Sequence, residues 1–478
     1  MTRKPARRLE GDMRGVWLWL TVVAAVLSGG GAAAEDWPRF RGPNGSGVSN
    51  SAAVPAEFGP SKNLVWKTPV PFGRSSPVLA GDRIFLTAAE GNTLITLCLD
   101  RASGRVIWRK EITRSRVTPV YKLNDAASPT PVTDGANVFV FFPDVGLIAF
   151  GPDGAERWRL PLGPFDTFYG LGASPILAGD TLLLVCDART GAFLIAVDTA
   201  SGRVRWRAER RETSFEGHAS PVVSERKGET PQVIVLGVNR IDAYDVATGE
   251  RKWWLNGLAF LPVASPVLGP DVVIVSTWGS DAPVGPSFEE FLKTDANKDR
   301  RLTPEETGGW DEFGAVDTNR DGIIVEAEWN ALRQAGVGDY GMVAVGLRGA
   351  RGDLTETGII WRDRKNHSTI PTPVVYKSVL YVIKNGGIIA SLDPGTGEIF
   401  KVGRTKEALG DYYASPVAAD GKVIFLSDSG KATVLKADRQ WEILAVNDIG
   451  EESYATPAIA DGKIFLRTRN ALYCFGAR

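Results

Sequence analysis

The sequence predicts an all-β protein, an eight-bladed β-propeller closed by an N-terminal strand, with a small helical insertion in blade five. A phrase of Ser or Thr, then Pro, then an apolar residue occurs eight times, with its prolines at 77, 131, 175, 221, 266, 373, 416 and 457. Successive prolines are 54, 44, 46, 45, 107, 43 and 41 residues apart. An ordinary step has room for four short β runs, which is the content of a propeller blade. The step of 107 residues therefore holds one blade and an insertion.

Each unit repeats the same order of segments. Residues 75–108 show it in full: a Ser-Pro-Val phrase, a Gly-Asp turn, two apolar runs, and a Gly four residues before Trp108. The same Gly-to-Trp spacing recurs at 154–158, 202–206 and 249–253. A flat indole can pack against the Gly-containing turn of the neighbouring blade. We therefore expect these tryptophans to belong to the core and not to a cofactor site.

The two ends of the array are expected to share one blade. The final unit supplies three strands, over 455–458, 463–467 and 471–475. Residues 63–67 have the pattern of an outermost strand, Trp66 included, and precede the first phrase. Pairing the two segments closes the ring and removes its open sheet edges.

Residues 1–34 have the composition of a signal peptide, with basic residues before an apolar core at 16–27 and three alanines before Glu35. The apolar run is too short to predict a stable membrane span, although a retained anchor is the alternative. We expect export to the periplasm, the cell surface or the exterior. No cysteine follows Ala34 at the predicted cleavage point, so no lipid anchor is expected there.

Composition excludes some partners. A formal net charge of −1 gives no global field that would attract nucleic acid or an anionic membrane. The cysteines, Cys98, Cys186 and Cys474, lie apart within apolar runs and are expected to be buried free thiols. Pro and Gly punctuate residues 36–47 too heavily for a strand, so this segment is expected to form a strap held by Trp37 and Phe40.

We accordingly divide the chain into five parts. These are the signal peptide (1–34), the strap (35–62), the first part of the propeller up to blade five (63–280), the insertion (281–340), and the rest of blade five with blades six to eight (341–478).

The insertion contains two tandem matches to the twelve-residue EF-hand calcium loop. The predicted ligands of the first loop are Asp295, Asn297, Asp299, Arg301, Thr303 and Glu306. Those of the second loop are Asp317, Asn319, Asp321, Ile323 and Glu328. This spacing supplies side-chain oxygens, one backbone carbonyl (from Arg301 or Ile323) and a bidentate carboxylate, which suit the oxygen preference of Ca²⁺. We expect one or two bound ions; acidic surface turns are the alternative.

The two loops are not equivalent. The second has Gly322 at position six, where the sharp turn needs a positive φ, whereas the first has Arg300 there. We expect the second loop to bind more tightly, although Val325 at its ninth position offers no side-chain oxygen. Ser287 and Glu290 form a capping box at the start of the entering helix.

The position of the insertion predicts a site. It lies between the second and third strands of its blade, so it shares a face with the segments that precede the eight phrases. These segments carry aromatic and histidine side chains that are expected to ring the mouth of the central channel. The predicted ring is Tyr169, His218, His367, Tyr412, Tyr413 and Tyr454. A ligand that is a protein or a small molecule is expected on this face, with plain packing as the alternative.

The Asp-x-x-Thr/Ser-Gly-x-x-x-Trp phrases at 100–108, 198–206 and 245–253 resemble the repeats of the pyrroloquinoline-quinone-like propeller family. That family includes quinoprotein alcohol dehydrogenases and the outer-membrane assembly lipoprotein of the BamB type. Residues 37–43 are similar to a segment of exported members from planctomycete-like bacteria. The resemblance covers residues 37–478 apart from the insertion, and it implies the fold more strongly than an activity.

Three functions are weighed. We favour a non-catalytic exported binding or scaffold protein with Ca²⁺ in its insertion, because no Ser/His/Asp or His-cluster spacing is present and no catalytic residue can be assigned. The alternative is a dehydrogenase that oxidises alcohols or sugars with pyrroloquinoline quinone, for which the family's vicinal Cys-Cys pair is lacking. The second alternative, an outer-membrane assembly factor, implies a lipidated cysteine that this sequence does not offer after Ala34.

Overall fold

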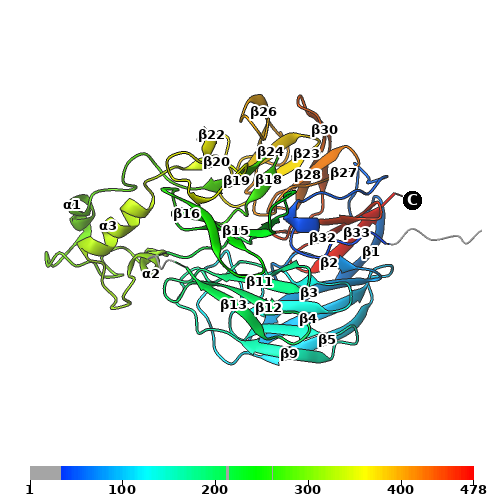
Figure 1. Ribbon diagram of the computed structural model, residues 1–478, viewed down its shortest axis with the longest axis horizontal. Helices are drawn as coiled ribbons and strands as arrows, with labels where there is room; N and C mark the ends of the chain where they lie inside the picture. Colours follow the sequence, from blue (N-terminus) through cyan, green and yellow to red (C-terminus); the bar gives the residue numbers. More distant parts are fainter. Residues whose placement is uncertain (1–33, 211–214, 261, 478) are drawn as a thin grey trace, which may run out of the picture. The chain divides into compact units, whose positions relative to one another are not determined.

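The computed structural model describes residues 34–477 except 211–214 and 261. These residues belong to one compact unit, and the predicted signal peptide lies outside them except for its last residue. Within the described residues there are eight sheets, one for each phrase, which confirms the eight-bladed propeller (Figure 1).

Blades one to four follow the chain in order. Blade one contains β2 (Val78–Ala80), β3 (Arg83–Glu90), β4 (Thr93–Asp100) and β5 (Val106–Thr113). Blade two contains β6 (Val132–Thr133), β7 (Val138–Phe142), β8 (Gly146–Phe150) and β9 (Glu156–Pro161). Blade three contains β10 (Ile176–Ala178), β11 (Thr181–Cys186), β12 (Phe193–Asp198) and β13 (Val204–Glu209). Blade four contains β14 (Val222–Ser224), β15 (Gln232–Gly237), β16 (Arg240–Asp245), β17 (Arg251–Asn256) and β21 (Gly352–Asp353).

Blades five to eight complete the ring. Blade five contains β18 (Val267–Gly269), β19 (Val272–Thr277), β20 (Gly341–Gly346) and β22 (Ile359–Asp363). Blade six contains β23 (Val374–Tyr376), β24 (Val379–Lys384), β25 (Ile388–Leu392) and β26 (Ile399–Arg404). Blade seven contains β27 (Val417–Ala419), β28 (Lys422–Leu426), β29 (Lys431–Lys436) and β30 (Glu442–Asp448). Blade eight contains β31 (Ala458–Ala460), β32 (Lys463–Arg467), β33 (Ala471–Gly476) and β1 (Leu64–Pro69).

The burial of a strand follows its place in the blade. Middle strands such as β7 and β8 are buried at every residue, because both of their faces pack against neighbouring blades. The outermost strands β5 and β9 instead alternate between half-buried and exposed residues, since their outward side chains reach solvent.

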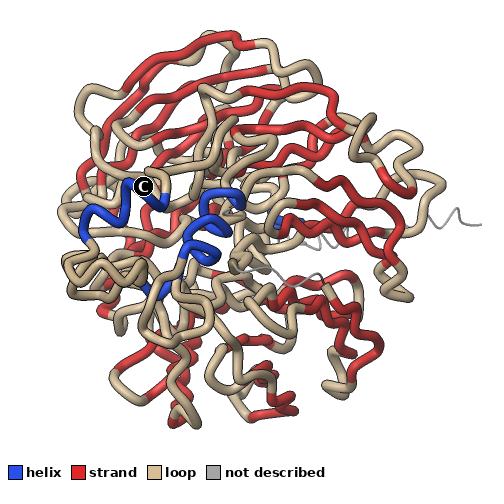
Figure 2. Tube along the Cα trace, turned by 90° about the vertical axis from the view of Figure 1, so that its left-hand side faces the viewer, coloured by secondary structure: helices blue, strands red, loops and turns tan. Residues whose placement is uncertain are grey.

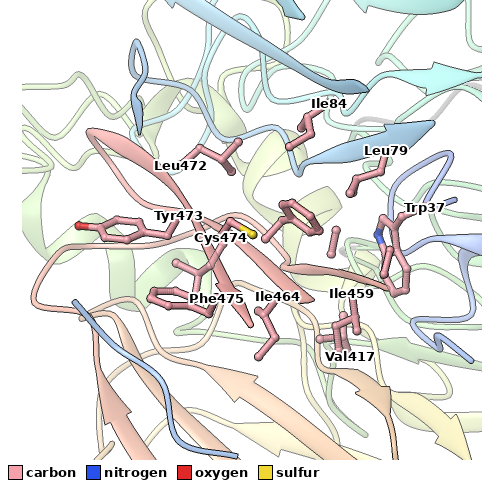
Figure 3. Close-up of a cluster of buried hydrophobic side chains, with 14 of the residues drawn as sticks. Trp37, Leu79, Ile84, Val417, Ile459, Ile464, Leu472, Tyr473, Cys474 and Phe475 are labelled. Atoms are coloured by element: carbon pink, nitrogen blue, oxygen red, sulfur yellow. The ribbon is translucent and has the colours of Figure 1, made fainter. Parts of the chain in front are cut away.

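The predicted closure of the ring is confirmed. β1 pairs antiparallel with β33, so the N-terminal strand becomes the outermost strand of the last blade. Figure 3 shows the core at this junction, where side chains of β33 lie near Ile84 of blade one, Val417 of blade seven and Trp37 of the strap. The tertiary closure thus removes the free edges that the first and last strands would otherwise expose.

Tryptophans of the outermost strands seal the wedges between blades, as the sequence predicts. A Cβ atom added to Gly202 would lie 2.6 Å from the indole of Trp158, and one added to Gly249 would lie 2.6 Å from that of Trp206. These two indoles also donate a hydrogen bond from Nε1 to a carbonyl of the next blade, Trp158 to Thr199 at 2.8 Å and Trp206 to Val246 at 2.9 Å. The glycine at this turn is therefore required by close approach as well as by its positive φ.

Blade four departs from the four-strand expectation. The short strand β21, from the loop before β22, pairs in parallel with β17 and adds a fifth strand. Trp253 of β17 donates its indole N–H to the side chain of Gln232, at 2.9 Å, and not to a carbonyl of the next blade. At the junction of blades four and five, β21 and its loop thus take the place of the Gly-containing turn that contacts the indole at other junctions. The sequence at 358–361, where Gly358 stands three residues before Trp361 and not four, departs from the repeat accordingly.

The strap crosses the first strands of several blades. Trp37 exchanges two backbone hydrogen bonds with Leu79 of β2, and Thr133 of β6 donates to Pro38. After the single-turn helix η1 (Pro43–Gly45), the strap pairs with Ala418 of β27 on another side of the ring. Figure 1 shows this dark-blue segment near the inner strands of the blades. The segment predicted as a strap therefore contacts the first strands of blades one, two and seven across the centre of the ring.

The insertion leaves blade five between β19 and β20. Its helices are α1 (Phe288–Phe291), η2 (Leu292–Thr294), α2 (Phe313–Val316) and α3 (Glu326–Ala335). The predicted capping box at the start of α1 is present. A separate apolar cluster holds the helices together, with Phe288, Leu302 and Trp329 among its members. Figure 2 views the molecule from this side, with the helices in front of the blade strands.

Candidate functional site

Hydroxyl groups of the repeated phrase form a belt around the centre of the ring. The eight hydroxyl residues are Ser76, Thr130, Ser174, Ser220, Ser265, Thr372, Ser415 and Thr456, and all are buried. Within the described residues, seven hydrogen bonds of 2.8–3.1 Å run from the backbone N–H of one to the side-chain oxygen of its neighbour in the next blade. Each of these seven hydroxyls thus satisfies a buried N–H of the neighbouring phrase.

The same residues form part of the wall of a cavity of about 370 Å³ at the centre of the propeller. A second ring lies beside the belt, made of the residue two positions before each hydroxyl. This ring is Arg74, Ser128, Gly172, His218, Val263, Ile370, Tyr413 and Tyr454. Each blade therefore contributes one constant hydroxyl and one variable side chain, at a fixed spacing in the sequence.

Six further residues complete the cavity wall. Phe40 comes from the strap, and Glu312 comes from the insertion. Tyr121, Leu123, Asn124 and Tyr169 come from the connectors that precede blades two and three. The cavity thus brings together segments that are far apart in the chain.

Charged groups in the cavity are few. Arg74 stacks over the ring of Tyr454, with 4.1 Å from its guanidinium carbon to the ring centroid, and its Nε lies 3.9 Å from the carboxylate of Asp125. Glu312 accepts a hydrogen bond from the hydroxyl of Tyr121 at 3.3 Å. Burial lowers the pKa of His218, opposed by the charge of Glu216, so this imidazole is neutral at pH 7. The wall is therefore dominated by hydroxyl and aromatic groups.

Four residues of the predicted ring line the cavity, namely Tyr169, His218, Tyr413 and Tyr454. Tyr412 does not, because successive residues of the connector point to opposite sides; its hydroxyl is buried and donates to Ala408 at 2.7 Å. His367 also lies outside the cavity wall, and the nearby positive charge of Lys384 adds to burial in lowering its pKa. The expectation for these two residues is therefore corrected.

A buried ion pair joins the insertion to the cavity wall. Nε of Arg189 lies 3.1 Å from Oε1 of Glu216, and both side chains are almost completely buried. Nη2 of Arg189 donates to the carbonyls of Gly314 and Ala315 in α2, at 3.0 and 3.3 Å. Glu216 accepts the backbone N–H of Tyr169 at 2.8 Å. One ion pair therefore fixes both α2 and a tyrosine of the cavity.

Other contacts hold the insertion on the same face. Lys122 pairs with Asp311 at 2.6 Å, and Arg320 pairs with Asp166. Leu332 and Ala335 of α3 pack on a small apolar cluster of blade four and its connectors, which contains Val238 and Phe260. The predicted placement of the insertion beside the segments before the phrases agrees with these contacts.

The two predicted calcium loops lie side by side. Leu302 and Ile324, at position eight of each loop, exchange two backbone hydrogen bonds of 3.0 and 2.8 Å. Position six has a positive φ in both loops, 62° for Arg300 and 79° for Gly322. Arg300 therefore adopts a left-handed conformation that costs a residue with a side chain about 1 kcal/mol.

The first and twelfth residues of each loop hold the loop's own backbone. Asp317 accepts N–H bonds from Asp321 and Gly322 at 3.2 and 2.9 Å, and Glu328 accepts from Thr318 at 3.0 Å. Asp295 and Glu306 do the same in the first loop. Among the described residues, no group of three or more His, Cys, Asp or Glu is arranged to hold a metal ion. Calcium binding at these residues stays a prediction.

The three cysteines lie away from the cavity wall. Cys98, Cys186 and Cys474 are free and buried, each within a blade strand, as expected. None lines the cavity wall, and burial raises the pKa of the Cys98 thiol to about 11. The residues present therefore do not provide the thiol pair that the resemblance implies beside pyrroloquinoline quinone.

No helix among the described residues is long and apolar enough to cross a membrane.

Sequence reasoning missed two parts of this site. From the sequence, no role was assigned to the hydroxyls of the repeated phrase, although a hydroxyl repeated in register eight times is itself a signal of a circular arrangement. Glu312 carried no motif, and only the docking of the insertion brings it to the cavity.

Comparisons with known proteins agree with this architecture. A family model described as outer membrane protein assembly factor BamB matches residues 56–167, 144–282 and 326–478. No curated protein matches the sequence.

Solved structures with the same fold are distant in sequence. BamB from Moraxella catarrhalis is 13% identical, with a TM-score of 0.54 over 86% of this chain and 98% of that one. Quinohemoprotein alcohol dehydrogenase from Comamonas testosteroni is 12% identical, with a TM-score of 0.59 over 93% and 81%. The computationally designed protein Ika8 is 10% identical, with a TM-score of 0.57 over 87% and 100%. At these identities the likeness shows the fold alone.

Proposed function

The chain belongs to the family of the outer membrane protein assembly factor BamB, and from this premise we propose that it is an exported, non-catalytic binding protein with a calcium-binding insertion. Its ligand, a small molecule or a protruding segment of a protein, enters the central cavity on the face that carries the insertion. Export rests on the signal-peptide composition of residues 1–34.

One observation carries this proposal: the strap and the insertion both contribute side chains to the wall of the cavity. Phe40 belongs to the first and Glu312 to the second, and both line the same space. A concave site with aromatic walls and a few convergent polar groups is the usual form of a ligand site. The neutral His218 is the one histidine of the wall, and no nucleophile–base pair faces it among the described residues.

Calcium is assigned to the two loops as an element that holds the insertion folded. The second loop would be held by Asp317, Asn319, Asp321, the carbonyl of Ile323 and Glu328, and the first by Asp295, Asn297, Asp299, the carbonyl of Arg301, Thr303 and Glu306. The ion would neutralise the acidic side chains of each loop and brace the Leu302–Ile324 pairing. A chelator should then increase proteolysis at 280–340 while the blades stay resistant.

The test of the binding function is a ligand screen on the purified chain, read as a shift of the unfolding temperature with Ca²⁺ or with chelator. A ligand of the cavity should lose its effect in the Tyr413→Ala variant. Tyr376→Ala is the matched control, because Tyr376 is half-buried on blade six and does not line the cavity. A ligand effect that survives Tyr413→Ala and fails with Tyr376→Ala would place binding elsewhere.

The dehydrogenase alternative has its own test. Adding pyrroloquinoline quinone and Ca²⁺ to the purified chain should produce neither a bound chromophore nor dye-linked oxidation of alcohols or sugars. Detection of both would replace the binding function with an enzymatic one. An assembly role, the second alternative, would be favoured by specific co-purification with an outer-membrane protein, which a small-molecule binder does not require.

A further inference from the structure

The strap buries two arginines beneath the hydroxyl belt. Arg39 is 4% exposed and Arg41 is 0% exposed. Nη2 of Arg39 donates to the carbonyl of Pro221 at 2.7 Å, and Nη2 of Arg41 donates to that of Pro373 at 2.6 Å. Both prolines belong to repeated phrases, those of blades four and six. The two guanidinium groups therefore lie at the centre of the ring, flanking the phrase of blade five.

Most of their hydrogen-bond donors have no acceptor. A guanidinium carries five N–H groups: one on Nε and two on each terminal nitrogen. Nε and Nη1 are buried and without a partner in both residues, which leaves three unsatisfied N–H groups on each. No ion pair joins either arginine to a carboxylate anywhere in the described part of the chain.

Other buried arginines of the protein are satisfied differently. Arg210 faces the carboxylates of Asp187 and Asp242, at 2.6 and 3.2 Å. Arg467 has no ion pair, but it donates to four oxygens, including the carbonyls of Thr87 and Pro71. Arg467 leaves only its Nε without a partner, whereas Arg39 and Arg41 each leave both Nε and Nη1 unpartnered.

The positive charges of Arg39 and Arg41 are also uncompensated. Burial lowers the pKa of each guanidinium to about 9, and the charge of Arg39 lowers that of Arg41 further. Both remain charged at pH 7, so two like charges are buried without an ion pair to a carboxylate of the described residues. A buried ion is costly unless it is paired and its hydrogen bonds are made. A single negative ion that accepts a hydrogen bond from each group would offset the like charges and satisfy some of the unpartnered donors.

We propose that Arg39 and Arg41 bind one small inorganic anion, of the size of chloride, at the centre of the propeller. Each arginine contributes one of its unpartnered groups, Nε–H or an Nη1 N–H, because these groups of one guanidinium point to different sides and do not converge on a single small acceptor. The anion is enclosed when the strap closes across the ring, so it stabilises the closed propeller by binding the folded state and not the unfolded chain. This site is separate from the ligand cavity, whose wall contains Phe40 but neither arginine.

The test uses the purified chain in mixtures of sodium chloride and sodium gluconate at constant ionic strength, since gluconate is a much larger ion than the chloride that the site is proposed to enclose. The urea midpoint of unfolding should rise with chloride, in proportion to the logarithm of its concentration once the site is mostly filled. Crystals soaked in bromide should show an anomalous peak within hydrogen-bond distance of Nε or Nη1 of both arginines.

Variants separate the site from general effects of salt. Arg41→Met should lose the chloride dependence, whereas Arg467→Met, which also removes a buried arginine, should be less stable yet keep it. If Arg41→Met does not fold, the bromide map of the unaltered protein decides. A midpoint that is the same in chloride and gluconate, or density for water alone at these four nitrogen atoms, overturns the proposal.

Discussion

Arg189 and Glu216 form a buried ion pair, with 3.1 Å between Nε and Oε1, at the point where the insertion meets the cavity wall. Arg189 lies in the loop between β11 and β12, and Glu216 lies in the connector that leads to blade four. The pair also holds carbonyls of α2 and the backbone of Tyr169. Docking of the insertion and shape of the cavity are therefore linked by one contact.

Arg189→Met should lower the free energy of unfolding by about 3–5 kcal/mol, because it leaves the carboxylate of Glu216 buried without a cation. Urea denaturation measures the change. The double variant Arg189→Met with Glu216→Gln should be more stable than the single one, since no buried charge remains. A loss below about 1 kcal/mol for the single variant would mean that water reaches the pair.

The calcium loops should respond unequally to matched substitutions. Asp317→Ala with Glu328→Ala should abolish most Ca²⁺ binding in a calorimetric titration and leave the β-sheet circular dichroism unchanged. Asp295→Ala with Glu306→Ala should have the smaller effect, because Arg300 strains the first loop. Arg300→Gly should strengthen binding to the first loop by relieving that strain. Unchanged stoichiometry in the Asp317 and Glu328 variant would refute the assigned ligands.

A pair of glycine substitutions in blade three separates backbone strain from steric overlap. Gly179→Ala and Gly202→Ala both place a methyl group at positive φ, 58° and 70°. No heavy atom lies within 4 Å of the added Cβ at Gly179, whereas at Gly202 the indole of Trp158 is 2.6 Å away. Gly202→Ala should therefore cost about 1–3 kcal/mol more than Gly179→Ala in urea denaturation. Equal losses of unfolding free energy in the two variants would show that the indole of Trp158 can move aside without an energetic penalty.

Substitutions of Ser174 test how much a hydroxyl of the belt contributes to the stability of the fold. Ser174→Ala removes the acceptor for the buried N–H of Thr130, which lies 2.9 Å from the serine oxygen, and should lower stability by about 1–3 kcal/mol. Ser174→Thr is the matched control, since three positions of the belt already carry threonine. The alanine variant should lose several times more stability than the threonine variant; the reverse order would assign the effect to volume.

His218 should make the protein sensitive to mild acid. Burial lowers its pKa in the folded state below the value near 6.5 of an unfolded chain, so the unfolded chain binds the proton more readily. The stability that neutral His218 provides is complete above about pH 6.5 and is lost as the pH falls through the folded pKa. His218→Gln should flatten the change in urea midpoint between pH 7.5 and 5.5. An unchanged slope would assign the acid sensitivity to carboxylates or to His367.

The sequence predicted the fold because its signal is periodic. Eight phrases at blade spacing, a tryptophan four residues after a glycine, and an unpaired outer strand at 63–67 each have a local physical meaning, and together they admit one closed arrangement. The same local logic located the insertion and its capping box, since a helix start and a calcium loop are both read over a few residues.

The composition of the site was decided by tertiary structure. The repeated spacing in the sequence places one hydroxyl and one variable residue of each blade at equivalent positions, although that spacing alone does not show that they line the cavity. The sequence did not determine that Tyr412 turns away while Tyr413 faces the cavity, because side-chain direction in a connector depends on the packing of blades six and seven. Nor did it determine the roles of Phe40, Glu312, Arg39 and Arg41. These residues reach the centre only when the strap and the insertion fold back across the closed ring, over separations that no local pattern encodes.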